Sequence, residues 1–394
     1  MIDFDKRIDR IQTASEKWSK EVLLRKFGRD DLLPFWVADM DFEGPPAVCD
    51  ALSQRTQGSS YGYEVRPERL SEAIADWYSR RHDWQFSETE LCFCPGTLNA
   101  ISLMIEQHSS EGDGVIVQPP VYFEFQPVID ASNRTVVLNP LKQIEGGYEM
   151  DFDDLEIKAA DPRNRLLILC SPHNPVGRVW SSDELERLGE ICRRHQVMVV
   201  ADEVHGDFVF PGHVFTPFAS ISKSFAKNSI TCLSPAKTFG IPAASESVVV
   251  IPDAELRAQF QRCSERLGLH RVNAFNAVAM LAAYQDGEDW LNQAVAYVAR
   301  NVELLQNALP DRVPGVRLVA PAATYMVWLD FRSLGLNREQ LERMLIQEAR
   351  MALKSGHSFG PTGDGFARMA IACPRSLLEE AVTRLEQVVR SIGD

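Results

Sequence analysis

The sequence has little positive charge, few cysteines and no long apolar run. Its 41 lysine and arginine residues are outnumbered by 55 acidic residues, which gives a net charge of -14. Such a chain is a poor partner for nucleic acid or for an anionic membrane surface, because both carry negative charge themselves. We therefore expect neither as a partner, and a small anionic ligand would have to be held by local groups.

The cysteines and the apolar residues exclude further classes of protein. Eight cysteines in 394 residues are too few for a disulfide scaffold, and Cys92-Phe93-Cys94 lacks the spacing and the second half of a zinc site. Residues 1–7 lack the apolar core of a signal peptide, and no run approaches the length of a membrane span. We expect reduced and mostly buried thiols, no metal, no membrane partner and a cytoplasmic location.

What is present is the pattern of a parallel sheet. Apolar, β-branched runs at residues 114–117, 166–170, 197–201 and 247–251 predict buried strands, with helical patterns among them. One helix is predicted after Ser181, which has Glu184 three residues later as in a capping box. Asn174 follows the second run and Asp202 the third, so both side chains are expected at the same edge of the sheet.

The chain is long enough for one large core and a second domain. From about residue 285 the pattern changes to long helices, with an apolar run at residues 326–331. We predict an α/β fold in which a large domain over residues 45–285 has a mostly parallel sheet flanked by helices. A smaller α+β domain is predicted from residues 1–44 and 286–394.

Lys237 points most directly to a chemistry. It lies in Ser-Pro-Ala-Lys-Thr-Phe-Gly, 35 residues after Asp202 and 63 after Asn174. Pyridoxal 5'-phosphate (PLP) needs an amine to anchor its aldehyde, a carboxylate for its ring nitrogen and a donor to its phenolic oxygen. Taken singly, the three residues also fit a solvated lysine, a helix-capping aspartate and a turn asparagine. Together they predict a PLP site that acts on an amino acid.

The phosphate of PLP would also need a binding site. Gly96-Thr97-Leu98 precedes a helical pattern at residues 100–105, and a helix start offers free backbone N–H groups and a positive dipole end to a phosphate. Ser234 adds a hydroxyl on the segment that carries Lys237. A glycine before a helix is also an ordinary turn residue, so this motif alone is not specific.

Three further residues are candidates for the ring and for the substrate. Tyr122 is placed to stack on the pyridine ring or to pack in the core, and His205 to hydrogen-bond near the ring or to serve as a structural histidine. Arg368 lies among apolar residues after a glycine-rich loop, where it needs an anionic partner. That partner is either a substrate carboxylate or the carboxylate of a structural salt bridge.

The chain resembles a known family over essentially its whole length. The resemblance is carried by residues 35–42 (FWVADMDF), 61–63 (YGY), 119–122 (PPVY), 171–177 (SPHNPVG), 201–205 (ADEVH), 234–239 (SPAKTF) and 372–375 (ACPR). The chain is similar to the fold-type I PLP-dependent enzymes of the class I/II aminotransferase superfamily. Within them it resembles the cystathionine β-lyase-like C–S lyases, the group that includes the maltose-regulon modulator of enteric bacteria.

The resemblance implies a role for several residues. Carried over by position, they are Lys237 as the lysine that bonds to PLP and takes the α-proton, Asp202 as the partner of the ring nitrogen, Asn174 as the donor to the phenolic oxygen, Tyr122 as the stacking ring and Arg368 as the carboxylate clamp. Trp36 and Asn174 are expected to contact the substrate beside the clamp. Tyr61 would reach the cofactor phosphate of a neighbouring subunit, which implies a homodimer with shared active sites.

The reaction that the resemblance implies is α,β-elimination. A C–S β-lyase cleaves cystathionine or a related S-substituted L-cysteine to a thiol, pyruvate and ammonia. Phe123-Glu124 stands where two prolines are common in the family, so residues of the pocket change while those of the chemistry are kept. Two alternatives stay open, an aminotransferase or other PLP-dependent enzyme of a specialised pathway, and a regulatory protein that uses the fold as a binding surface.

Overall fold

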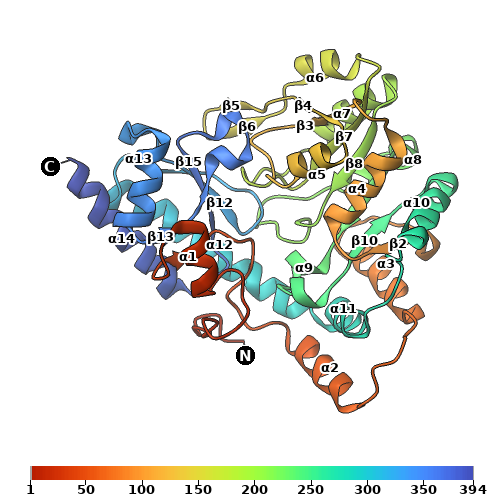
Figure 1. Cartoon of the computed structure of the whole chain (residues 1–394), viewed down its shortest axis with the longest axis horizontal. Helices are drawn as coiled ribbons and strands as arrows, with labels where there is room; N and C mark the ends of the chain where they lie inside the picture. Colours follow the sequence, from red (N-terminus) through yellow and green to blue (C-terminus); the bar gives the residue numbers. More distant parts are fainter. Residues whose placement is uncertain (1, 394) are drawn as a thin grey trace.

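A seven-stranded sheet forms the centre of the larger part of the molecule (Figure 1). The structure is a computed structural model, and it describes residues 2–393. Neighbouring strands of the sheet are parallel except where β10 pairs antiparallel with β2 and β9. In spatial order the strands are β2 (Leu91–Cys94), β10 (Ser247–Val250), β9 (Ser229–Leu233), β8 (Met198–Asp202), β7 (Asn164–Cys170), β3 (Gly114–Val117) and β4 (Thr135–Leu138).

Helices cover both faces of this sheet. Along β7, Leu166 and Ile168 pack in one apolar cluster, while Leu167 and Leu169 pack in another on the opposite face. This alternation has the period of a strand, and burial on both sides explains the unbroken apolar runs in the sequence. The first cluster includes side chains of α4 (Thr97–His108), α5 (Phe125–Ala131) and α10 (Ala254–Arg266), and the second those of α6 (Phe152–Ala159), α7 (Ser182–Arg194) and α8 (Lys223–Lys227).

The strands and the helix start predicted for this part of the chain are confirmed. The runs at 114–117, 166–170, 197–201 and 247–251 correspond to β3, β7, β8 and β10, with small differences at their ends. The α7 helix begins with the expected capping box, in which Ser181 Oγ accepts from Glu184 N at 3.2 Å and Ser181 N donates to Glu184 Oε2 at 2.8 Å. Asp202 is the last residue of β8 rather than the first residue beyond it.

A second, antiparallel sheet lies in the C-terminal part of the chain, where long helices and a strand at residues 326–331 were expected, and that strand is β12. Its strands, in spatial order, are β11 (Arg317–Val319), β12 (Met326–Asp330), β15 (Phe366–Ala370) and β14 (Lys354–Ser355). The helices near it are α12 (Glu288–Arg312), α13 (Arg338–Arg343) and α14 (Arg375–Gly393). The observed architecture is therefore α/β with an additional α+β region, while the boundaries predicted at residues 45 and 285 stay predictions.

The N-terminal segment joins this second region. The strand β1 (Leu33–Pro34) pairs in parallel with β13 (Met351–Ala352), and α1 (Lys20–Phe27) lies beside them (Figure 1). Lys17 is fully buried and its Nζ lies 2.6 Å from Asp41 Oδ2, while Arg10 pairs with Asp39 at 2.7 Å. Leaving one member of a buried pair without its partner is costly, so these contacts fix residues 35–42 in place.

Four further α-helices and one β-hairpin complete the set of α-helices and β-strands. They are α2 (Pro46–Gln57), α3 (Glu68–His82), α9 (Pro235–Thr238), α11 (Ala274–Asp286) and the hairpin of β5 (Lys142–Ile144) and β6 (Gly147–Glu149).

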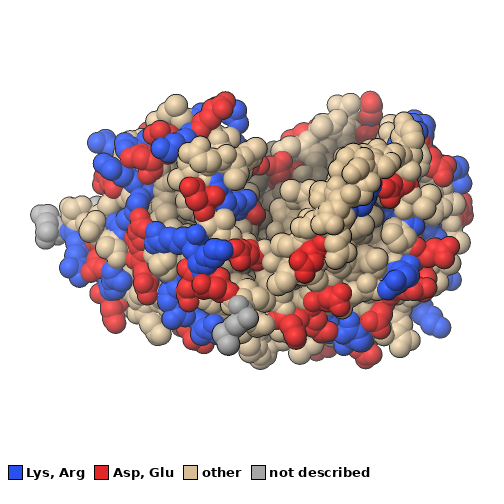
Figure 2. Space-filling view, turned by 90° about the horizontal axis from the view of Figure 1, so that it is seen from below, with Lys and Arg blue, Asp and Glu red and all other residues tan. Residues whose placement is uncertain are grey.

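All eight cysteines are free thiols and six of them are buried. Within residues 2–393, no helix combines the length and the apolar content that a bilayer span requires. Figure 2 shows acidic and basic side chains interspersed over one face, which is hollowed near its centre.

Candidate active site

The predicted polar residues gather at the carboxyl ends of three adjacent parallel strands. The spatial order β9-β8-β7 places Lys237, Asp202 and Asn174 beside one another, because each follows or ends one of these strands. The start of α4 lies at the same edge, since β2, which precedes it, runs in the same direction as β9. Open α/β sheets bind their ligands at this edge.

These residues line one cavity of about 310 Å³. The sequence-predicted members of its lining are Gly96, Thr97, Leu98, Tyr122, Asn174, Asp202, His205, Ser234 and Lys237. The volume suits a small organic ligand, and the lining combines apolar walls with a few convergent polar groups. The structure thus brings these side chains together, whereas the role of each one remains a prediction.

Lys237 is not a solvated surface lysine. It sits on the short helix α9, and its Nζ donates to the carbonyl oxygen of Ala38 at 2.9 Å. Burial and the Arg368 guanidinium lower the pKa of its amine to about 8, although the carboxylates of Asp39 and Asp202 oppose the shift. A larger fraction of this amine is therefore neutral at physiological pH than for an exposed lysine, and the neutral form is the nucleophile and the base.

Asp202 is a buried carboxylate without a cationic partner in the part of the chain that the structure describes. Its Oδ1 accepts a long hydrogen bond of 3.4 Å from Val204 N. Burial raises the pKa of this carboxyl to about 6, and the Val204 N–H and the charge of Lys237 act in the opposite direction. An unpaired buried carboxylate is costly, so the site favours a ligand that brings a positive charge, such as a protonated pyridine nitrogen.

The start of α4 supplies the complementary place for an anion. The twelve-residue helix begins at Thr97 after Gly96, and no side chain caps it. Its first backbone N–H groups are therefore available to a phosphate, which the positive end of the helix dipole also attracts. Thr97 Oγ1 lies 3.1 Å from Ser247 Oγ, and Ser234 Oγ accepts from Ala236 N at 3.2 Å, so three residues with hydroxyl groups line the same cavity.

Arg368 bridges the two sheets without forming a salt bridge. Its side chain is 1% exposed, its Nη1 donates to Asn174 Oδ1 at 3.2 Å and its Nη2 donates to the carbonyl oxygen of Trp36 at 2.9 Å. Its Nε is buried with no hydrogen-bond partner among the described residues. Burial lowers the pKa of the guanidinium to about 10, which leaves it charged. The structural salt bridge considered from the sequence is absent from residues 2–393, so a ligand carboxylate fits this position best.

His205 and Tyr122 are held in their neutral forms. Burial, together with the charges of Lys237 and Arg368, lowers the pKa of His205 to about 3. Its Nδ1 is buried without a partner in the described chain, although the residue lines the cavity. Burial raises the pKa of Tyr122 to about 12. The unpartnered nitrogen, the uncapped helix and the unpaired Asp202 together fit the donor and acceptor set that PLP requires.

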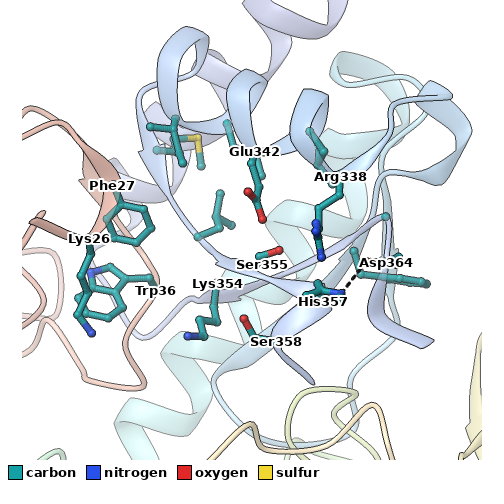
Figure 3. A pocket seen from close by; sticks show the side chains of 17 residues that line it. Lys26, Phe27, Trp36, Arg338, Glu342, Lys354, Ser355, His357, Ser358 and Asp364 are labelled. Carbon is teal, nitrogen blue, oxygen red and sulfur yellow. Dashed lines mark hydrogen bonds and ion pairs between the residues drawn. The ribbon is translucent and has the colours of Figure 1, made fainter. Parts of the chain in front are cut away.

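Three predicted site residues, Arg368, Trp36 and Tyr61, do not line this cavity, and Arg368 reaches it only through its hydrogen bond to Asn174. The ring of Trp36 lines a second cavity (Figure 3), and only its carbonyl oxygen reaches Arg368. Tyr61 is 61% exposed, stacks on Phe275 with ring centroids 5.9 Å apart, and donates to the carbonyl oxygen of Thr56 at 3.1 Å. Its predicted contribution to the site of a neighbouring subunit therefore stays a prediction.

Several lining residues were missed by the sequence reasoning. Ala38 accepts the hydrogen bond of Lys237, and Glu246 lines the cavity while it pairs with Arg66. Asn99 and Ser247 also contribute to the lining. A charged residue directly before an apolar strand was a signal for Glu246, because such a residue sits at a strand end. No local signal marked Ala38, whose approach depends on how the N-terminal segment folds back.

The comparisons with known proteins agree with this geometry. The family described as aminotransferase class I and II matches residues 30–385. The chain is 40% identical over 385 residues to cystathionine beta-lyase PatB of Bacillus subtilis strain 168, covering 98% of this chain and 99% of that protein. It is 32% identical over 394 residues to protein MalY of Escherichia coli strain K12, with 100% of both chains covered.

A solved structure extends the likeness to the whole fold. The crystal structure of cystalysin from Treponema denticola, which contains PLP, superposes with a TM-score of 0.96 at 29% identity and covers 99% of each chain. The fold and the family expected from the sequence motifs are thereby confirmed. With the family match, the two full-length relatives and this superposition in hand, we conclude that the chain belongs to the aminotransferase class I and II family.

Proposed function

We propose that this protein is a PLP-dependent C–S β-lyase. It cleaves the bond between Cβ and sulfur in cystathionine or a related S-substituted L-cysteine, and with one water it yields a thiol, pyruvate and ammonia. One observation carries the proposal. A single cavity holds both the buried amine of Lys237 and the buried carboxylate of Asp202, which has no cationic partner in the described chain. The naming of a relative 40% identical over its whole length as a cystathionine β-lyase supports the same reaction.

The residues present fit PLP as the cofactor. In the proposed arrangement Asp202 pairs with the ring nitrogen, Asn174 donates to the phenolic oxygen and Tyr122 packs on the ring, while the start of α4 holds the phosphate. When bound, PLP supplies an electron sink for the carbon next to the substrate nitrogen. The buried carboxylate of Asp202 stabilises positive charge on the ring because water does not screen it there.

The protein's own groups would position the substrate and move its proton. Arg368 binds the α-carboxylate, and Asn174, which already accepts from its Nη1, keeps the guanidinium oriented. Lys237 Nζ takes the proton from the α-carbon, and its lowered pKa brings it close to the pH at which a general base works best. His205 remains neutral beside it, which avoids a third positive charge next to Lys237 and Arg368.

The protein is also proposed to work as a cytoplasmic homodimer with shared active sites. The segment that carries Tyr61 exposes two further large apolar side chains, Tyr63 at 95% and Val65 at 86%. Apolar side chains gathered on one exposed segment are typical of an interaction surface. Analytical ultracentrifugation of the wild type should give a dimer. Tyr61→Phe should weaken PLP retention without changing that mass, and a monomeric wild type would contradict the proposal.

Product analysis tests the reaction. Purified holoenzyme is incubated with cystathionine and a panel of S-substituted L-cysteines, and thiol, pyruvate and ammonia are measured together. Equal amounts of all three are expected for a β-elimination. An oxo acid formed without ammonia or thiol would instead identify an aminotransferase, the alternative reaction within the same family. The absence of products from every substrate would refute both activities.

A further inference from the structure

Asp207 is a buried carboxylate that does not line the cavity of Lys237. It is 4% exposed, and it follows Asp202, which does line that cavity, on the same stretch of chain. Gly206 N donates to the carbonyl oxygen of Glu203 at 3.0 Å, so the chain turns between the two aspartates. Taking a charge out of water is costly unless partners compensate for the loss, so the partners of Asp207 indicate what it does.

The Asp207 carboxylate has partners on two helices. From α3, Trp77 Nε1 donates to its Oδ1 at 3.0 Å, and His82 Nε2 and Arg81 Nε lie 2.8 Å and 3.4 Å from the same oxygen. From α9, Thr238 Oγ1 donates to its Oδ2 at 2.9 Å. Burial opposes the ionisation of Asp207, but the hydrogen bond and charge of His82 and the charge of Arg81 outweigh it and hold the pKa of the carboxyl below its ordinary value. A charged carboxylate therefore joins α3 to α9.

The helix α9 depends on such a contact for its position. It is a single turn of four residues with the sequence Pro-Ala-Lys-Thr, and one turn makes too few backbone hydrogen bonds to be stable by itself. Its two polar side chains are those of Lys237 and Thr238. In the proposed function the Lys237 amine bonds to PLP, so its hydrogen bond to Ala38 cannot hold α9 throughout the reaction. The Thr238 hydroxyl is free of that task and stays bonded to Asp207.

The contact of Asp207 with α9 acts through geometry rather than through charge. Burial lowers the pKa of the Lys237 amine, and the charges that act on this amine are those of Arg368, Asp39 and Asp202. The charge of Asp207 is balanced on the side of α3 instead. What Asp207 gives to Lys237 is therefore a fixed neighbour, because the next residue along α9 is bonded to a carboxylate that α3 holds in place.

We infer that Asp207 is a positioning residue, and that its hydrogen bond from Thr238 fixes the place of Lys237 relative to Asp202. We call this hydrogen bond the α9 anchor. The inference rests on the role proposed for Lys237 and is independent of the thioether that is cleaved. Without the anchor α9 shifts, and the amine moves away from the ring that Asp202 is proposed to hold. A misplacement of about 1 Å costs about 100-fold in rate.

Variants of Thr238 test the anchor and leave the charges around Asp207 in place. Thr238→Val removes the hydroxyl and keeps the shape of the side chain, whereas Thr238→Ser keeps the hydroxyl. The matched control is Ser229→Ala, which removes a buried hydroxyl at the other end of β9, where it donates to the carbonyl oxygen of Phe225 at 2.8 Å. In the holoenzyme, Thr238→Val should lower kcat by about 10- to 100-fold with little change in KM. Thr238→Ser and Ser229→Ala should match the wild type.

Attachment of PLP to the full-length protein freed of PLP gives a measurement without turnover. The Lys237 amine and the aldehyde carbon of PLP condense with loss of one water, and borohydride reduction followed by mass spectrometry reports the rate and the site. In the wild type the rate should rise with pH through about 8, the pKa that burial gives this amine. In Thr238→Val the amine gains contact with water, so the midpoint should move toward the ordinary lysine value of 10.5. A role in stability alone would lower the melting temperature and leave this midpoint unchanged.

A double variant tests whether Thr238 acts through Asp207. Asp207→Asn and Thr238→Val break the same contact, so the double variant should be no slower in turnover or attachment than Asp207→Asn alone. Losses that add would show that the two residues act separately, which would overturn the anchor. If Asp207→Asn fails to fold, because Arg81 and His82 lose their buried partner, the Thr238 variants decide by themselves.

The outcomes separate the anchor from the lyase function. Normal turnover and an unchanged pH midpoint in Thr238→Val would overturn the anchor and leave the lyase function standing. Failure of the wild type to cleave any thioether, combined with a shifted midpoint in Thr238→Val that Thr238→Ser restores, would overturn the lyase function and support the anchor. Attachment of PLP to a lysine other than Lys237 would overturn both.

Discussion

The two sheets deliver polar side chains to the site from different positions. In the seven-stranded sheet these residues come from the strand ends, as with Asp202 at the end of β8 and Lys237 beyond β9. In the four-stranded sheet Arg368 comes from within a strand, as the third residue of β15. The reason is coverage, because helices bury both faces of the first sheet and leave only its edge for polar groups.

The four-stranded sheet is divided differently. Ala367 and Met369 pack into an apolar cluster with α12 and α14, while Arg368, between them, points to the opposite side and contacts Asn174. An antiparallel sheet with one face on a core can use its other face for polar groups. This division suggests that the first sheet serves the cofactor and the reaction, and that the second serves the substrate.

The largest effect is expected at Lys237. Replacement by Ala should lower kcat by at least about 1,000-fold for every substrate, because a positioned general base contributes about 100- to 10,000-fold and the anchor of the cofactor is lost as well. Steady-state kinetics and the PLP content after gel filtration measure the two losses. Lys223→Ala, which removes an exposed lysine of α8, should leave both unchanged. A Lys237→Ala variant with normal turnover would remove the basis of the proposed mechanism.

Asp202→Asn should be the next most severe change. In the holoenzyme this carboxylate is proposed to pair with the ring nitrogen of PLP, and removing one member of a buried charge pair costs about 3–5 kcal/mol. We therefore expect kcat to fall by about 100-fold or more while KM changes little. The start of α4 and Lys237 remain to hold PLP, so the cofactor content should stay close to that of the wild type. A variant that changes KM and not kcat would contradict the assignment of the first sheet to the reaction.

Arg368→Lys should affect binding more than turnover. A lysine keeps the positive charge but cannot bind a carboxylate in the bidentate geometry of a guanidinium. KM should therefore rise by about 10- to 100-fold, because a hydrogen bond to a charged group contributes about 1.5–3 kcal/mol. Initial rates over a wide range of substrate concentration separate KM from kcat. Arg317→Lys, on the exposed edge of the same sheet, is the matched control. An equal loss of kcat would show that the two sheets do not divide the work in this way.

The smallest effect concerns stability and compares one carboxyl from each sheet. Glu203 follows β8 and is buried, which raises its pKa from 4.5 to about 8, and its Oε2 has no hydrogen-bond partner among the residues described. The folded state therefore binds more protons than the unfolded state between these values, and stability falls as pH rises through them. At pH 8, Glu203→Gln should raise the melting temperature and increase the free energy of unfolding by about 1 kcal/mol or more. At pH 5 both increases should be much smaller.

Asp330, at the end of β12, should behave in the opposite way. Burial opposes its ionisation, but hydrogen bonds from Arg332 outweigh it and hold the pKa of the carboxyl below its ordinary value. The folded state thus gains stability from the charged form above that ordinary value and loses it as pH falls. Asp330→Asn should lower the melting temperature at pH 8 and have little effect in acid. Thermal unfolding of both variants against pH checks the two signs, and a shift of the same sign would contradict the contrast.

Much of the fold and of the cofactor site followed from local patterns. Apolar runs predicted four of the central strands, the Ser181–Glu184 pair predicted the start of α7, and the order of the runs placed Asn174 and Asp202 at one edge. The strand before Lys237, β9 (Ser229–Leu233), was not predicted. These predictions succeed because strand burial, capping and the common edge of parallel strands depend on residues close in sequence. The antiparallel direction of β10 relative to β9 was not predicted, because an apolar run in the sequence does not indicate the direction of its strand.

What the amino-acid sequence determined by itself is therefore the parallel sheet and the chemical groups at its edge. The tertiary structure alone decided which distant segments meet there. It brought Ala38 to Lys237, Arg368 to Asn174 and Lys354 to Phe123, across separations of many residues. Such approaches depend on how the N-terminal segment and the second sheet pack, and the shifted pKa values of Lys237 and Asp202 follow from the burial that this packing creates.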